Sequence, residues 1–188
     1  NCILAGNKAQ GAGGAVMSLF NSNPRILHCT FIANLAGRGG ALAARGQGHT
    51  LVSHCILWDN AAAQGATVYL ALNEWTAIQT SSATVEYSNV QNGPDGTFRE
   101  PGCTLNWSVG NLDAEPRFTG PTYDDYRLSP DSPCIDAGNP EYDLASNPTD
   151  LDGSSRQFGA AVDLAVVHPL QEVPVSVQAV VAGNAAHA

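Results

Sequence analysis

Two aspartates near the C-terminal end of the chain have the spacing of ligands in a calcium-binding loop. The segment Asp150-Leu-Asp-Gly153 has the Asp-x-Asp-Gly opening of such loops, in which oxygen atoms at alternate positions bind the ion. A full EF-hand loop has an acidic residue at its twelfth position, which is Ala161 here. We favour a plain Asx turn. The alternative is a structural calcium ion held by Asp150, Asp152 and Asp163.

Cysteines recur at a regular interval and offer a second kind of metal chemistry. Cys2, Cys29 and Cys55 are spaced by 27 and 26 residues, and His28 and His54 precede two of them. The neighbours of each cysteine are apolar, and no carboxylate stands at a position that matches the histidines. We therefore predict that the cysteines are buried, reduced packing residues. The two histidines are predicted to stack as a surface ladder.

The charge and composition of the chain exclude two classes of partner. The 188 residues include 8 Lys and Arg against 17 Asp and Glu, which gives a formal net charge of -9. This balance offers no basic surface for nucleic-acid phosphates or an anionic membrane. No run of about 20 apolar residues is present that would span a bilayer as a helix. The 19 Gly residues and the scarcity of Lys and Glu favour a turn-rich, all-β chain.

Three sets of residues keep one register along the first part of the chain. Cysteines, asparagines and glycines follow one another at intervals of 26 or 27 residues. The aligned positions are Cys2, Cys29 and Cys55, then Asn7, Asn34 and Asn60, then Gly13, Gly39 and Gly65. A degenerate fourth copy begins at Ser88, after an insertion rich in Thr and Ser. A period of this length, built of short strands and glycine turns, predicts the coils of a parallel β-helix.

Positions within each copy indicate which side chains face the interior. Successive side chains of a strand point to opposite faces, so Cys29 shares a face with Phe31, and Cys55 shares a face with Leu57. We assign this face to the core. The asparagines are expected to form corner ladders and to adopt the left-handed conformation that turns the chain. The repeated glycines mark a second corner, where a side chain would clash.

Two other repetitive folds fit the pattern less well. A leucine-rich horseshoe has a similar period but needs regular leucines and a helical half, which are absent. An antiparallel sandwich would show turn signals about every 8 to 12 residues, without markers in register at 26. The parallel β-helix is therefore the predicted fold.

The repeats resemble those of a known family. Phe31-Ile-Ala-Asn34 and Gly39-Gly-Ala-Leu42, with Gly13-Gly-Ala-Val16, are similar to the F-x-x-N and G-G-A-[ILV] motifs of chlamydial polymorphic outer-membrane-protein repeats. Such repeats also occur in bacterial surface proteins with right-handed, pectin-lyase-like β-helices. The resemblance implies a right-handed parallel β-helix in an extracellular or cell-surface protein.

The second half of the chain resembles the C-terminal cap of large secreted or anchored β-helix proteins. The similar segments are Gly110-Asn-Leu-Asp-Ala-Glu-Pro-Arg-Phe118, Asp125-Tyr-Arg-Leu128, Ser132-Pro-Cys-Ile-Asp-Ala-Gly138, Asp150-Leu-Asp-Gly153 and Gly159-Ala-Ala-Val-Asp-Leu164. After Leu164 the chain reads Ala165-Val-Val-His168, where the resemblance implies Gly-Ala-Tyr-Glu.

These patterns predict three regions. Coils are expected over residues 1–100, an irregular cap packed on the last coil over 101–164, and an extended or disordered tail over 165–188. Because the chain begins inside the repeat, we interpret it as a fragment that lacks upstream coils. Cys103 and Cys134 fall in the predicted cap, where a disulfide between them is an open alternative.

Enzymatic chemistry on a polysaccharide would need clustered carboxylates, or calcium with an Arg or Lys base. Polygalacturonases combine Asn-x-Asp, an Asp pair and Gly-His-Gly in that order. Here Gly48-His49-Thr50 is an imperfect match and precedes Asp124-Asp125, so the order of the motifs fails. The upstream candidates for a lyase are Asp59 and Glu74, with Arg25, Arg38 and Arg45, and their spacing predicts no cluster.

Aromatic residues are the remaining candidates for contact with a ligand. Trp58, Tyr69 and Trp75 could stack on sugar rings along one wall, although packing under the insertion explains them equally well. The leading hypothesis is a non-catalytic extracellular or cell-surface β-helix module, acting as a scaffold, an adhesin-like stalk or a glycan-contacting surface. The alternative is a polysaccharide lyase or glycoside hydrolase of the pectin-lyase-like class, with its active residues in a groove or in missing coils.

Overall fold

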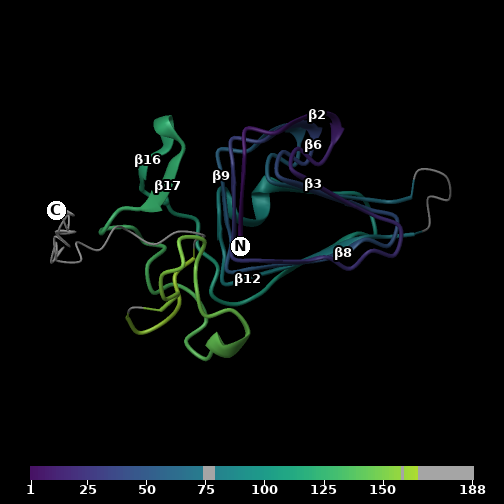
Figure 1. Ribbon diagram of the computed structural model, residues 1–188. Coiled ribbons are helices and arrows are strands. Elements are labelled where there is room, and N and C mark those ends of the chain that lie inside the picture. Colours follow the sequence, from purple (N-terminus) through teal and green to yellow (C-terminus); the bar gives the residue numbers. More distant parts are fainter. Residues whose placement is uncertain (74–78, 158, 165–188) are drawn as a thin grey trace, which may run out of the picture.

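The computed structural model describes residues 1–73, 79–157 and 159–164. Within these ranges the chain winds through about four turns of a β-solenoid, and the strands of successive turns stack in parallel (Figure 1). The all-β parallel β-helix predicted from the repeat is confirmed. No helix among the described residues is long and apolar enough to cross a membrane.

Each of the first three turns contributes one strand to each of four parallel sheets, which we name A to D in chain order. Sheet A contains β1 (Cys2–Ala5), β5 (Cys29–Ile32), β9 (Ile56–Trp58) and β13 (Asn89–Val90). Sheet B contains β2 (Lys8–Ala12), β6 (Leu35–Arg38) and β10 (Ala61–Gln64). Sheet C contains β3 (Val16–Leu19), β7 (Leu42–Arg45), β11 (Val68–Ala71) and β14 (Thr97–Arg99). Sheet D contains β4 (Arg25–Leu27), β8 (His49–Ser53), β12 (Ser82–Glu86) and β15 (Thr104–Trp107).

The core lies inside the coil and is formed by alternate residues of sheets A, C and D. Cys2 is paired with Cys29, and Leu4 with Phe31, so equivalent residues of neighbouring turns stack on one another. Phe31 and Leu57 are each 1% exposed, and they belong to the apolar cluster predicted from the strand alternation. Cys2 is exposed, contrary to its predicted burial, because β1 is the edge strand of sheet A and no further coil covers it.

The corner between sheets A and B is built on an asparagine ladder. Asn7 Nδ2 donates a hydrogen bond to Asn34 Oδ1 at 2.8 Å, and Asn34 Nδ2 donates one to Asn60 Oδ1 at 2.9 Å. The left-handed residue is not the asparagine, as the sequence predicted, but the residue before it, such as Ala33 (φ 54) or Asp59 (φ 52). Because the preceding residue turns the chain, the amide of each later asparagine is free to bond the carbonyls of the turn before.

The glycines form the sharp corner between sheets B and C. Gly13, Gly39 and Gly65 have φ values of 72, 63 and 62, in the left-handed region that favours glycine. A Cβ atom on Gly39 would collide with the carbonyl group of Leu42. This corner reverses the chain direction, so sheet C follows sheet B after only a few residues.

The fourth turn is more regular than its sequence suggests. Strand β13 pairs with β9, which confirms the fourth copy predicted at Ser88. Ser88 occupies the cysteine position, and its Oγ accepts a hydrogen bond from Cys55 N at 3.1 Å. A 3-10 helix, η1 (Gly93–Gly96), stands where sheet B would continue, and β15 then pairs with β12. The predicted boundary at residue 100 therefore falls inside the fourth turn, because β15 carries none of the repeat markers.

Residues 108–157 and 159–164 follow the last strand of sheet D. Leu112 first stacks on Asn89 of the fourth turn, and the later apolar side chains of this segment lie against the outer face of sheet A (Figure 1). This segment, which we call the cap, contains the antiparallel hairpin of β16 (Phe118–Gly120) and β17 (Asp125–Leu128). It also contains the 3-10 helices η2 (Pro121–Tyr123) and η3 (Leu144–Ser146). Ile56 points outward from sheet A and is buried beneath Leu128, Cys134 and Leu164. The cap thus covers one wall of the solenoid as well as meeting its last turn. The predicted tail over 165–188 lies outside the described residues.

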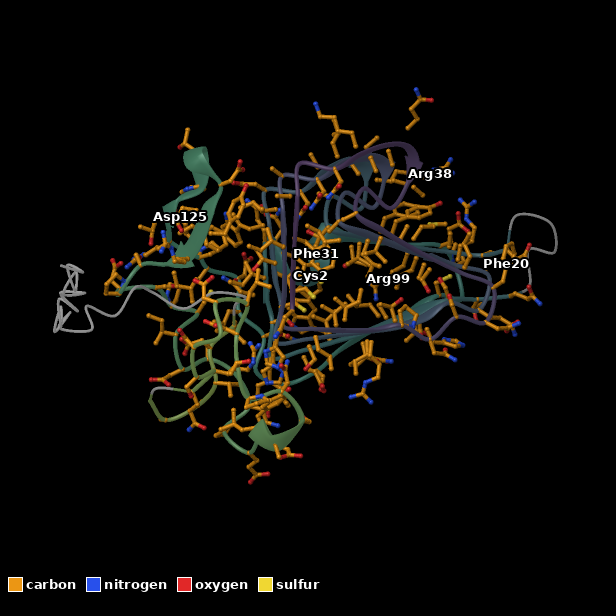
Figure 2. All side chains as sticks on the ribbon, viewed as in Figure 1. Cys2, Phe20, Phe31, Arg38, Arg99 and Asp125 are labelled. Atoms are coloured by element: carbon orange, nitrogen blue, oxygen red, sulfur yellow. The ribbon has the colours of Figure 1, made fainter. Side chains whose placement is uncertain are left out.

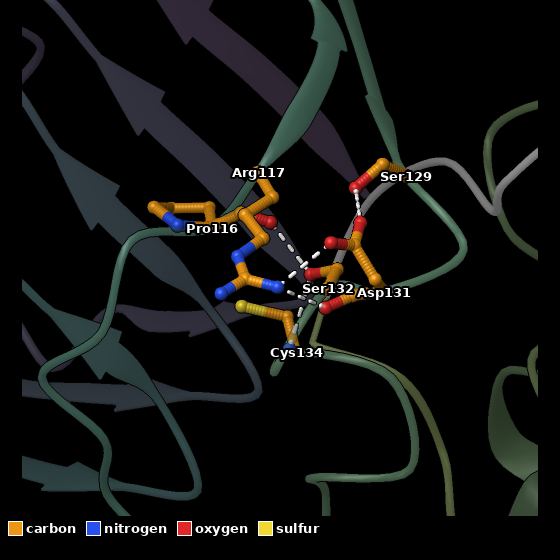
Figure 3. A network of polar contacts seen from close by, with 6 residues as sticks. All are labelled: Pro116, Arg117, Ser129, Asp131, Ser132 and Cys134. Carbon is orange, nitrogen blue, oxygen red and sulfur yellow. Dashed lines mark hydrogen bonds and ion pairs between the residues drawn. The ribbon is translucent and has the colours of Figure 1, made fainter.

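Polar contacts join two segments of the cap, one before β16 and one after β17 (Figure 3). Arg117 Nη1 donates to Asp131 Oδ2 at 2.7 Å, and Ser132 Oγ donates to the Pro116 carbonyl at 2.6 Å. The amide of Cys134 donates to Ser132 Oγ at 3.1 Å, which places the thiol in the cap core. Cys103 packs instead in the solenoid core. The two cysteines are free and do not form the disulfide that the sequence left open.

Candidate functional site

A groove of about 450 Å³ lies on the outside of the solenoid, beside the corner between sheets B and C. We call it the B–C groove, and its lining residues are Gln10, Gly11, Ala12, Met17, Gly37, Arg38 and Arg45. They come from strands β2, β3, β6 and β7, so the groove spans the first two turns. Figure 2 shows Arg38 on the outer side of the solenoid, near β6.

The floor of the groove is made of backbone and small side chains. A Cβ atom on Gly37 would lie 2.8 Å from the carbonyl oxygen of Gln10 and 2.9 Å from that of Gly11. At the corner itself, a Cβ atom on Gly40 would collide with the backbone of Ala66 and Ala61. The glycines therefore allow neighbouring turns to approach closely, and the long side chains of the groove stand at its rim.

An aromatic stack lies behind the arginines on the outer face of sheet C. The rings of Tyr69 and Phe98 are parallel, with centroids 5.4 Å apart, and the guanidinium carbon of Arg38 lies 5.7 Å from the Tyr69 centroid. Tyr69 Oη donates a hydrogen bond of 2.8 Å to Glu100. Burial raises the pKa of the Tyr69 phenol, and the bond to Glu100 raises it further. Tyr69 is therefore a neutral, fixed support for Arg38.

The charges of the groove suit an anionic ligand. Arg38 is exposed and Arg45 is half-buried, and the described residues that line the groove include no carboxylate. A guanidinium group binds carboxylate or sulfate oxygens in a planar, bidentate geometry. Gln10 adds an exposed amide that both donates and accepts hydrogen bonds. Two of the eight basic residues thus meet in one groove of a chain whose net charge is -9.

The aromatic candidates do not form one wall. Trp58 points outward from sheet A and packs beneath the cap with Tyr87 and Phe118. Tyr69 lies on sheet C and is 2% exposed, so it supports the groove without offering its ring face to a sugar. Trp75 lies outside the described residues. Of the two candidates within the described residues, Tyr69 is therefore the one placed next to the B–C groove.

The three calcium candidates differ in their exposure and in the hydrogen bonds that they accept. Asp150 Oδ1 accepts a 2.9 Å hydrogen bond from Ser154 N, and Asp163 Oδ1 accepts one of 2.8 Å from Asp136 N. Both carboxylates are buried, whereas Asp152 is exposed. Within the described residues, no three His, Cys, Asp or Glu side chains form a group suited to a metal ion. The carboxylates of Asp150 and Asp163 hold backbone turns of the cap.

The two histidines stack, as predicted, but they are buried. The ring centroids of His28 and His54 are 4.8 Å apart, and the side chains are 0% and 3% exposed. The cap covers them because Tyr142 packs edge-on against both rings, and Asn139 N donates to His54 Nε2 at 3.1 Å. Burial, and then the positive charge of Arg156, lower the pKa of His28 to about 2 and that of His54 to about 4. The histidines are neutral packing residues between solenoid and cap.

A second hollow groups three aspartates with an arginine. It lies on the cap beside Ile3 and is lined by Asp124, Asp125, Arg127 and Asp152. Arg127 forms two 2.7 Å hydrogen bonds with Asp125, and this pairing lowers the pKa of the Asp125 carboxyl. Asp125 is therefore ionised and held by its partner, so it is unsuited to act as a general acid.

No family model, no curated protein and no solved structure was found to match the chain. The geometry of the B–C groove is therefore the main structural indication of function. The sequence contained a signal for this groove, because Arg38 directly precedes the Gly39-Gly40 corner and Arg45 ends the following strand. Spacing alone did not show that the corner brings these two arginines onto one outer surface.

Proposed function

We propose that this chain is a non-catalytic β-solenoid module that binds an acidic polysaccharide in the B–C groove. The observation that carries the proposal is the meeting of Arg38 and Arg45 in one groove of a strongly acidic chain. Two guanidinium groups of the second turn, one on sheet B and one on sheet C, match a polymer that carries a carboxylate or sulfate on each repeating unit. The resemblance of the repeats to bacterial surface proteins supports an extracellular or cell-surface location.

The residues around the groove support binding without catalysis. Glu100, the carboxylate behind Tyr69, accepts hydrogen bonds from Tyr69 Oη and from Leu72 N, both at 2.8 Å. These bonds hold Glu100 in a structural role. General acid–base chemistry on a sugar needs carboxyl groups within reach of the scissile bond. The groove lining supplies cations and amides instead.

Equilibrium binding to two polymers tests the proposal. The chain is titrated with polygalacturonate and, separately, with the neutral polymer dextran, at low ionic strength. We expect binding to polygalacturonate only, weakened by added salt. The double variant Arg38→Ala, Arg45→Ala should weaken binding by at least about tenfold, because each guanidinium loses charge-assisted hydrogen bonds. The double variant Arg25→Ala, Arg99→Ala removes two exposed arginines outside the groove and is the matched control for net charge.

Three results would contradict the proposal. Equal binding of dextran would show that binding does not depend on charge. Equal losses of affinity in the groove and control variants would show that binding does not take place in the groove. Release of reducing or unsaturated sugars from polygalacturonate, abolished by a single substitution in the chain, would establish the lyase or hydrolase alternative.

A further inference from the structure

The thiols of Cys2, Cys29 and Cys55 lie one above another along the inner face of sheet A, and we call this row the file. It begins at the end of the solenoid that the first turn forms. Cys2 and Cys29 are register partners in the parallel pair β1–β5, and Cys29 N donates to Cys55 Sγ at 3.4 Å. Their exposure falls along the file: Cys2 is exposed, Cys29 is 8% exposed and Cys55 is 0% exposed. Figure 2 shows Cys2 on the inner side of the wall. The file is thus a graded series with one end open to solvent.

A pocket of about 640 Å³ gives access to the first two thiols of the file. Cys2 and Cys29 both line it, together with the apolar side chains of Leu4, Val16 and Ile26. Cys55 is not part of the lining. A small reagent that enters the pocket therefore meets two thiols and leaves the third untouched.

The register of β1 and β5 places Cys2 and Cys29 at a separation that a disulfide can span. Neighbouring strands of a sheet lie about 4.8 Å apart, and disulfides join residues whose Cα atoms are roughly 4.4 to 6.8 Å apart. Both side chains leave the sheet on the same face, because register partners in a parallel pair point the same way. Cys2 belongs to the edge strand, so small movements of its backbone meet no neighbouring strand on the outer side.

We propose that Cys2 and Cys29 are a redox-active dithiol, which a small disulfide such as oxidised glutathione converts into a Cys2–Cys29 disulfide that joins the first two turns. The Cys2 thiolate attacks one sulfur of the reagent, forms a mixed disulfide and releases one glutathione thiolate. The Cys29 thiolate then attacks Cys2 Sγ and releases the second. Two protein thiols lose two protons and two electrons, and one oxidised glutathione becomes two reduced glutathione molecules.

The third thiol, that of Cys55, affects the reactivity of Cys29. The Cys55 side chain, whose Sγ accepts a hydrogen bond from Cys29 N, lowers the pKa of Cys29 to about 6, and this effect exceeds the opposing effect of burial. Burial raises the pKa of Cys55, which therefore remains a protonated donor. Cys29 is thus the resolving thiolate, while exposed Cys2 is the thiol that a bulky disulfide reaches first.

Peptide mapping after oxidation tests this pairing directly. The eight Lys and Arg residues place all five cysteines in different tryptic peptides, with Cys2 in 1–8, Cys29 in 26–38 and Cys55 in 46–99. The folded, reduced chain is incubated with oxidised glutathione, the remaining thiols are alkylated, and the digest is analysed by mass spectrometry without reduction. We expect a 1–8 peptide linked to a 26–38 peptide as the main product, with the Cys55 peptide alkylated.

Variants and a denatured control make the outcome decisive. Cys2→Ser changes an exposed residue and should abolish the linked product, while Cys103→Ser, in a different part of the core, should leave it unchanged. In denaturing urea the preference for Cys2–Cys29 should be lost. Glutathione retained on Cys2, a Cys29–Cys55 link as the main product, or no modification would each overturn the proposal.

The disulfide should also alter thermal stability. It closes a loop between the first two turns, and such a crosslink raises the Tm of a chain of this size by roughly 5 to 10 °C. The oxidised chain is compared with the same sample after reduction, and Cys2→Ser is expected to show no difference between the two treatments. A Tm unchanged by oxidation in a sample with the mapped link would show that the link constrains nothing, contrary to the proposed joining of two turns.

Discussion

The side chain of Asn34 forms hydrogen bonds with the turns on both sides of its own and so links three successive turns of the solenoid. Its Nδ2 donates to the Leu4 carbonyl at 2.8 Å and to Asn60 Oδ1 at 2.9 Å, while its Oδ1 accepts from the backbone and side chain of Asn7. Asn34 is 1% exposed, and its bond to Asn60 is fully buried, whereas the bonds to Asn7 and Leu4 are partly buried. A buried amide with satisfied donors and acceptors stabilises a fold chiefly because the unsatisfied alternative is costly.

Asn34→Ala is therefore expected to lower the free energy of unfolding by about 2 to 4 kcal/mol, since it removes the bonds to both neighbouring turns and leaves the buried Asn60 amide without its partner. Urea denaturation followed by circular dichroism measures the change. The control is Asn106→Ala, because Asn106 is exposed and makes one long 3.3 Å bond to Thr84; its expected effect is within about 0.5 kcal/mol. Equal effects of the two variants would refute a ladder that stabilises the coil.

At the scale of elements, sheet A has two buried faces. Its inner face belongs to the solenoid core, and its outer face belongs to the interface with the cap. Strand β9 illustrates this, because Leu57 points into the coil while Ile56 and Trp58 point into the cap. Such a strand reads in sequence as an unbroken apolar run, which is typical of parallel sheets covered on both sides.

Replacing Ile56 with Asp should detach the cap while leaving the coil folded, because the new charge is buried only in the cap interface. Limited trypsin digestion followed by mass spectrometry should show faster cleavage after Arg117 and Arg127, with the coil peptides protected. Leu35→Asp is the matched control, since Leu35 is 46% exposed on sheet B. Unchanged cleavage of Ile56→Asp would mean that the cap does not depend on this face.

At the scale of the whole molecule, solenoid and cap meet around His28 and His54. The folded pKa values are about 2 and about 4, below the ordinary value of 6.5, because both rings are buried beneath the cap. The unfolded chain binds protons below a pH of about 6.5, whereas the folded chain does not until much lower pH. The stability of the folded chain is therefore fully present above pH 6.5 and is lost as the pH falls toward the folded values.

We expect the free energy of unfolding to decrease by about 2 to 4 kcal/mol between pH 7 and pH 5 from these two groups together. Urea denaturation at a series of pH values measures it. His28→Phe keeps a ring in the stack and should remove about half of the dependence, and His49→Phe, at an exposed position, should leave it unchanged. A pH profile of His28→Phe identical to that of the parent chain would refute the assignment.

The sequence by itself determined the coil. The register of Cys, Asn and Gly at 26 or 27 residues predicts stacked parallel turns, the interior face of sheet A and the glycine corner, because a solenoid places residues one period apart in direct contact. In the coil, residues that are one period apart in sequence are also neighbours in space, so the sequence pattern reports the tertiary contacts.

Only the tertiary structure decided where the cap lies and what the outer surfaces do. The cap makes contacts between residues far apart in sequence, such as Asn139 with His54, and no period records them. For the same reason, the sequence showed that the histidines stack but not that they are buried. The grouping of Arg38 with Arg45 depends on how the turns fold around Gly39, which is a matter of three-dimensional geometry rather than of spacing along the chain.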